Sequence, residues 1–192
     1  MKCLIAGLAL LTLATSGCSA RDPGAAPANE TAAQVDGVLS QTAKAFIEAK
    51  NEGSKDHPEA SLYDASINAG QAMDSALAQA KAEGKLVIVA MGANWCHDSR
   101  AFAGWMIAPR FKKLIADHYV LIFVNVGRPQ TKDGHNLDIA KRYGIEIEGT
   151  PTVLILSPDG KLLNADTAKN WRDTASRSEN DIFDELQGFT TN

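Results

Sequence analysis

The chain has 192 residues, of which 45% are hydrophobic and 6% aromatic, and its formal net charge is −4 at pH 7. This length accommodates one domain with additional segments. The acidic balance and the scarcity of aromatic side chains argue against a nucleic-acid partner, and they predict a soluble α/β domain.

The first eighteen residues, MKCLIAGLALLTLATSGC, have the pattern of an export signal. A single charge, Lys2, precedes an apolar run over residues 4–14, which is too short to span a bilayer comfortably. Small residues and Cys18 follow, so the stretch resembles a bacterial lipoprotein signal in which residues 1–17 are removed and Cys18 is lipidated. The alternatives are an ordinary secretory signal cut after Ala20 and an uncleaved anchor.

The same signal determines which cysteines remain. Cys3 leaves with residues 1–17 and Cys18 becomes a thioether, so Cys96 is the only free thiol of the mature protein and no internal disulfide can form. Because Ser19 follows Cys18, the resemblance implies anchoring in the outer membrane, facing the periplasm. The alternative is a soluble periplasmic or secreted protein.

The next segment separates the anchor from the main domain. Residues 19–30 are rich in Pro, Ala and Gly, which is typical of a tether. Residues 31–50 carry apolar side chains at helical spacing, and a polar stretch then ends at Pro58. We therefore predict a tether with an N-terminal helix over residues 18–60 and the main domain over residues 61–192.

In the main domain, helical and strand patterns alternate. Two short, continuous apolar runs are typical of strands buried on both faces. Gly84 ends the first helix, and Pro109 begins another. The predicted helices are 65–83, 96–107, 109–118, 136–143 and 179–187; the predicted strands are 86–91, 120–126 and 152–156, with 161–164 as a hairpin partner and 127–135 as a polar loop.

Three motifs carry a family resemblance. A buried strand leads into Trp95-Cys96 with Ser99 three residues later, the sequence Tyr-Gly-Ile stands at 143–145, and Gly-Thr-Pro-Thr stands at 149–152. Together they resemble the thioredoxin-like superfamily over roughly residues 65–164. The resemblance implies an α/β fold with a central mixed sheet flanked by helices, here with an N-terminal helical extension. It also implies a cis bond before Pro151, and a substrate groove formed by Trp95, Thr150 and Pro151.

The position of Cys96 predicts a reactive thiol. A cysteine at a helix N-terminus faces unpaired N–H groups and the positive end of the helix dipole, which favour the nucleophilic thiolate. Ser99 lies one turn further and is a candidate donor to that thiolate. Arg100 and protonated His97 are candidate sources of positive charge, the alternative being that both are solvated surface residues. We therefore predict catalytic roles for Cys96, Ser99 and His97.

The chain also departs from the family pattern. Ser99 replaces the second cysteine, so another thiol must resolve any mixed disulfide at Cys96: a substrate cysteine, glutathione as co-substrate, or a partner reductase. Ala90 stands where thioredoxins carry a buried aspartate, and Phe123 stands about where they carry a lysine. The family's machinery for fast dithiol reduction is therefore missing.

Other chemistries find less support. Consecutive helical side chains diverge by about 100°, so Cys96, His97 and Asp98 cannot form a nucleophilic triad. We predict no metal site, because His57, His118 and His135 are scattered along the sequence without ligand spacing. Trp105 and Trp171 are predicted to pack in the core or beside the groove.

Two functions remain. The first is an envelope monothiol oxidoreductase or isomerase that forms mixed disulfides with proteins through Cys96 and needs no cofactor beyond a resolving thiol. The alternative is a redox-inactive binding module, chaperone or adaptor built on the same fold. For either function, the expected partners of the protein are protein thiols or disulfides and the membrane, not nucleic acid.

Overall fold

The computed structural model describes residues 57–131 and 133–191. The predicted signal, the lipidation site at Cys18, the tether and the helix at 31–50 lie outside these residues. Within the described part of the chain, no helix is both long enough and apolar enough to cross a bilayer.

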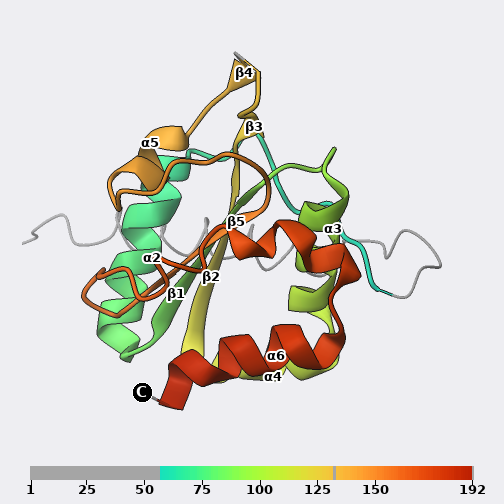
Figure 1. Cartoon of the computed structure of the whole chain (residues 1–192). Coiled ribbons are helices and arrows are strands. Elements are labelled where there is room, and N and C mark those ends of the chain that lie inside the picture. Colours follow the sequence, from blue (N-terminus) through green and yellow to red (C-terminus); the bar gives the residue numbers. More distant parts are fainter. Residues whose placement is uncertain (1–56, 132, 192) are drawn as a thin grey trace, which may run out of the picture.

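The centre of the molecule is a three-stranded mixed sheet in the order β2-β1-β5 (Figure 1). β1 (Leu86–Gly92) pairs in parallel with β2 (Tyr119–Asn125) and antiparallel with β5 (Thr152–Leu156). The strands are apolar on both faces because helices cover both sides. The predicted strands are confirmed to within one residue at each end.

Helix α2 (Ala69–Glu83) covers one face of the sheet (Figure 1). It begins four residues later than predicted, because the Asn68 side chain accepts a hydrogen bond from the Gln71 amide and caps the helix there. It ends at Gly84, whose φ of 68° lies in the left-handed region. Its small side chains allow close packing on the strands; the core on this face includes Ala72, Met73, Ala76, Ala80, Val87, Val89, Met91, Leu154 and Leu156.

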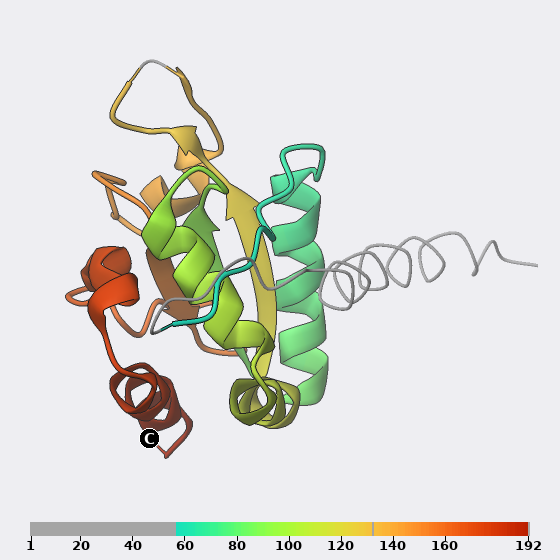
Figure 2. The same cartoon turned by 90° about the vertical axis from the view of Figure 1, so that its right-hand side faces the viewer.

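The other face carries α3 (His97–Ile107), α4 (Pro109–His118), the 3-10 helix η1 (Asn170–Ser176) and α6 (Glu179–Gly188) (Figure 2). A short 3-10 turn, η2 (Phe189–Thr191), follows α6. A capping box between Ser178 and Asp181 fixes the start of α6. The core on this face includes Ile88, Ala90, Phe102, Phe111, Phe123, Trp171, Ile182 and Leu186.

The predicted loop at 127–135 contains a small hairpin. β3 (Gly127–Arg128) pairs antiparallel with β4 (Asp133–Gly134), and α5 (Leu137–Lys141) follows, shorter than the predicted 136–143. Two-residue strands have too little apolar pattern to be predicted from sequence.

The predicted strand at 161–164 is wrong as a full hairpin partner. It is reduced to one bridge, between Leu156 and Leu162. Two backbone hydrogen bonds remain, from the Leu163 amide to the Ile155 carbonyl and from the Ser157 amide to the Lys161 carbonyl. The buried side chain of Asn164 supplies two more: its Oδ1 accepts from the Ile155 amide at 2.8 Å, and its Nδ2 donates to the Val153 carbonyl at 2.9 Å. A side-chain amide therefore satisfies the edge of β5 where a backbone strand was expected.

The burial of Trp171 gives a prediction about stability. Its ring is fully buried and meets Phe102 edge-on, with centroids 5.3 Å apart. We expect Trp171→Ala to lower the free energy of unfolding by about 3–5 kcal/mol, measured by urea denaturation. Leu163→Ala is the control, because Leu163 is 40% exposed and its truncation should cost less than about 1 kcal/mol. Equal losses in both variants would contradict a core role for Trp171.

Candidate functional site

Cys96 lies where the chain leaves β1 and enters α3. It is the N-cap residue of α3, with extended φ and ψ of −86° and 125°, and its carbonyl accepts the first helical bond from the Arg100 amide. The Cys96 amide in turn donates to the Ala93 carbonyl at 3.0 Å. This turn holds a half-buried thiol, the only free cysteine among the described residues, at the positive end of α3.

The loop before β5 forms the opposite wall. The Thr150–Pro151 peptide bond is cis, as predicted. The Cys96 thiol donates a hydrogen bond to the Thr150 carbonyl, with Sγ and O 3.1 Å apart. Thr152 helps to fix the loop, because its hydroxyl donates to the Gly149 carbonyl at 3.0 Å. The structure thus brings together three predicted site residues, Cys96, Thr150 and Pro151.

Trp95, the residue before Cys96, lies at the surface. Its side chain is the more exposed of the two exposed large hydrophobic groups among the described residues, at 43%. The ring does not swing freely: Nε1 donates to the Gly127 carbonyl at 2.8 Å, and the Arg128 guanidinium lies 4.6 Å from the ring centroid. The residue next to Cys96 therefore presents a fixed, exposed apolar surface, and its part in a substrate groove stays a prediction.

Ser99 faces the interior. It is fully buried, and its Oγ accepts a hydrogen bond from the Ala93 amide at 3.4 Å. No hydrogen bond within the described chain joins Ser99 to Cys96, so donation to the thiolate stays a prediction for the ionised state.

Tyr63 fills the space below the turn, and sequence reasoning missed it. Its backbone is held at both groups: the amide donates to Asn94 Oδ1 at 2.9 Å, and the carbonyl accepts from Asn94 Nδ2 and Asn125 Nδ2 at 3.1 and 2.9 Å. Burial raises the pKa of the Tyr63 phenol, and the negative charge of an ionised Cys96 raises it further. The available signal was an asparagine at or just beyond the ends of β1 and β2.

Apolar residues, Ala90 and Phe123, stand at the two positions where the resemblance to thioredoxins led us to expect an aspartate and a lysine. Ala90 and Phe123 are partners in the β1–β2 register, and the Tyr63 ring meets Phe123 edge-on at 5.2 Å. Neither Ala90 nor Phe123 has a side chain that can accept or release a proton. The site therefore lacks proton-transfer groups at the two positions that the sequence singled out.

Cys96, His97 and Asp98 have three different partners. The thiol meets Thr150, the His97 ring meets Glu59, and Asp98 Oδ1 accepts from the Ala175 amide at 2.9 Å. This divergence confirms that the three consecutive residues form no triad. Asp98 instead ties η1 to the first turn of α3.

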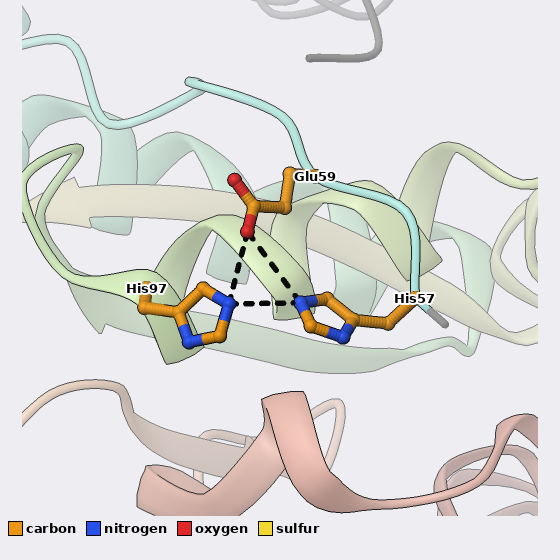
Figure 3. Close-up of side chains that lie close together, drawn as sticks. All are labelled: His57, Glu59 and His97. Carbon is orange, nitrogen blue, oxygen red and sulfur yellow. Dashed lines mark hydrogen bonds and ion pairs between the residues drawn. The ribbon is translucent and has the colours of Figure 1, made fainter. Parts of the chain in front are cut away.

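A cluster of two histidines and a carboxylate lies at the start of α3 (Figure 3). Glu59 Oε1 is 3.0 Å from His97 Nε2 and 3.5 Å from His57 Nε2, and the two Nε2 atoms are 3.0 Å apart. His57 is scattered from other histidines in the sequence, but the fold brings it to His97, so the prediction of no metal site loses its premise there. Residues 40 positions apart in the chain gave no spacing signal.

Arg100 completes this polar side of the site. Its Nε donates to Glu59 Oε2 at 3.0 Å, and its Nη1 donates to the Asn94 carbonyl at 3.1 Å. Burial alone raises the pKa of the Glu59 carboxyl, but Arg100, together with the two histidines, brings that pKa below its usual value. The positive charge of Arg100, which was predicted to favour the Cys96 thiolate, is thus paired with Glu59.

Comparisons with known proteins agree with this geometry. Residues 68–158 match a family model described as thioredoxin-like. A solved structure of a disulphide isomerase from Xylella fastidiosa Temecula1 is 27% identical, covers 67% of this chain and 95% of its own, and superposes with a TM-score of 0.60. A poplar thioredoxin h mutant is 20% identical over 64% of this chain and 79% of its own, with a TM-score of 0.44. No curated protein sequence matches.

Residues 68–158 match the thioredoxin-like family model, and the fold is the thioredoxin-like fold. The predicted fold class is confirmed.

Gly92 gives a test of the packing under the site. A Cβ added there would lie 2.6 Å from Ser99 Oγ and 2.7 Å from carbons of the Tyr63 ring. We expect Gly92→Ala to lower the free energy of unfolding by about 1–3 kcal/mol, measured by urea denaturation. Gly70→Ala is the matched control: its Cβ would meet only Asn68 Oδ1, at 3.5 Å, so stability should stay within about 0.5 kcal/mol. A neutral Gly92→Ala would show that Tyr63 and Ser99 are not packed as described.

Proposed function

We propose that this protein is a monothiol thiol–disulfide oxidoreductase or isomerase that forms mixed disulfides through Cys96. The observation that carries the proposal is the half-buried Cys96 thiol at the N-terminus of α3, hydrogen-bonded to the residue that precedes the cis proline. The thioredoxin-like fold and the similarity to a disulphide isomerase support this class of reaction.

The first step forms the mixed disulfide. Cys96 loses its proton, and with it the hydrogen bond to the Thr150 carbonyl, and the free N–H groups of the first turn of α3 stabilise the thiolate. The thiolate attacks one sulfur of a substrate disulfide. A Cys96–substrate disulfide forms, and the other substrate sulfur leaves as a thiolate.

The second step needs a thiol from outside the site. Ser99 cannot release the substrate, because an alkoxide is far too basic to form at neutral pH. A different substrate cysteine can attack the substrate sulfur, which creates a new substrate disulfide and returns the Cys96 thiolate with no net oxidation or reduction. Glutathione or a partner reductase can instead attack the Cys96 sulfur of the mixed disulfide, and the substrate leaves as a thiolate. A second thiol then attacks the attached group, forms a disulfide with it and returns the Cys96 thiolate, so the substrate is reduced at the expense of two thiols.

The neighbouring residues provide a place for the substrate chain. Trp95 offers a fixed apolar surface, and the loop at Thr150 and Pro151 lies directly beside the sulfur. An extended segment of a substrate protein placed along this loop brings its disulfide to Cys96. We further propose that the protein works in the cell envelope, anchored through a lipid on Cys18.

Ser99→Cys tests the role of the missing second thiol. Incubated with oxidised glutathione and acid-quenched, the natural protein should accumulate a glutathione adduct, mapped to Cys96 by peptide mass spectrometry. Ser99→Cys should lose most of that adduct and form an internal disulfide between positions 96 and 99, because a neighbouring thiol expels the bound one. Ser99→Ala is the matched control and should keep the adduct.

The rate of that reaction decides between the two functions. We expect Cys96 to be alkylated faster at neutral pH than free cysteine, and Cys96→Ala to abolish both the adduct and the isomerisation of a protein with scrambled disulfides. If Cys96 reacts no faster than free cysteine and Cys96→Ala keeps the protein's effect on its substrates, the monothiol enzyme is excluded and a binding module is left.

A further inference from the structure

Three potential metal ligands converge at the start of α3, next to the Arg100 side chain. The atoms are His57 Nε2, His97 Nε2 and Glu59 Oε1, and all of them lie within 4.8 Å of one another (Figure 3). We propose that these residues form a binding site for a first-row divalent cation, of which Zn²⁺ is the best match. The ligand set contains no sulfur, so the proposal stands independently of the chemistry proposed for Cys96.

The spacing of the three atoms matches a zinc site. Their separations are 3.0, 3.0 and 3.5 Å. A tetrahedral Zn²⁺ with ligands at about 2.0–2.1 Å places neighbouring ligand atoms about 3.3 Å apart. The triangle therefore has the size of one face of a zinc tetrahedron, and a cation just above its plane reaches all three atoms with little rearrangement.

The orientation of the rings points to the same ligand. In Figure 3 both Nε2 atoms face Glu59 and each other, whereas the Nδ1 atoms point away. Two imidazole nitrogens 3.0 Å apart can share only one proton, and with both rings in the Nδ1–H form their lone pairs oppose each other. A bound cation satisfies both lone pairs and the carboxylate oxygen at once.

The surroundings hold the ligands in place. Arg100 binds Glu59 Oε2 while Oε1 faces the histidines, as a partner that orients a metal-binding carboxylate does. The backbone that carries His57 and Glu59 is fixed to α3, because the Ala60 amide donates to the Arg100 carbonyl at 3.0 Å. Gly104 permits this approach, because a Cβ there would lie 2.3 Å from the Pro58 carbonyl oxygen.

Burial and exposure leave an entry path. The side chains of His57 and Glu59 are 7% and 9% exposed, whereas that of His97 is 43% exposed. Three protein ligands occupy three positions of a tetrahedron, and the fourth is left for water or for a small ligand, as in catalytic zinc sites.

The donor set decides the class of cation. Imidazole nitrogens suit zinc and its neighbours in the first transition row, whereas magnesium and calcium prefer oxygen ligands. Zn²⁺ should therefore bind, and Mg²⁺ should not displace it.

The test is Zn²⁺ binding by the full chain, purified without a polyhistidine tag and titrated against a chromophoric chelator. We expect the natural protein to bind Zn²⁺ in the presence of excess Mg²⁺. Loss of a ligand in His57→Ala, Glu59→Gln or His97→Ala should weaken binding by more than the ~10–100-fold typical for loss of an outer-shell partner. His118→Ala removes an exposed histidine of α4 and should bind as the natural protein does.

Two further measurements protect this result from misfolding and from the thiol. Circular dichroism should show that Glu59→Gln, which preserves side-chain shape, is folded when its affinity is compared. Cys96→Ser should retain Zn²⁺, and Co²⁺ bound at the site should lack a thiolate charge-transfer band. Unchanged affinity in the three ligand variants, or loss of Zn²⁺ in Cys96→Ser, would overturn the proposal.

Discussion

The hydrogen bonds that fix Tyr63 to Asn94 and Asn125 are the constraint on which the site depends. Through them, a segment that precedes the first helix is tied to the ends of two neighbouring strands. The buried ring then supports the turn below Cys96, and the residues just before it are brought onto α3. Without this attachment, Cys96 would still begin α3, but the Tyr63 ring would no longer pack beneath its turn. His97 would also lose both partners of its cluster, His57 and Glu59.

The strands and long helices could be predicted because their signals are local. Continuous apolar runs gave β1, β2 and β5, and Pro109 gave the start of α4. The prediction of a full strand at 161–164 failed because the sequence does not show whether a segment pairs with β5 through its backbone or through a side chain. In the structure, the Asn164 side chain makes two of the hydrogen bonds to β5. The cis bond before Pro151 followed from the family motif.

The polar half of the site could not be predicted for a different reason. His57 and His97 are 40 positions apart, and no periodicity links an extended segment to a helix. Arg100 was correctly placed near the site, but its partner depends on which segment packs against α3. The turn therefore has two chemically distinct sides, a sulfur facing the cis-proline loop and an imidazole facing a carboxylate, and they are carried by consecutive residues.

The extended segment from His57 to Tyr63 lies outside the part of the chain that matches the family model, residues 68–158. Cys96 and His97 lie inside it. The surroundings of the thiol are thus divided between the part of the chain that matches the family model and the short segment from His57 to Tyr63. This segment packs on α3 where Gly104 leaves room for its backbone. In this chain the matched part supplies the sulfur and one imidazole, whereas the segment from His57 to Tyr63 supplies the Tyr63 ring, the second imidazole and the Glu59 carboxylate. The environment of Cys96 therefore depends on a short segment that lies outside the part of the chain matched by the family model.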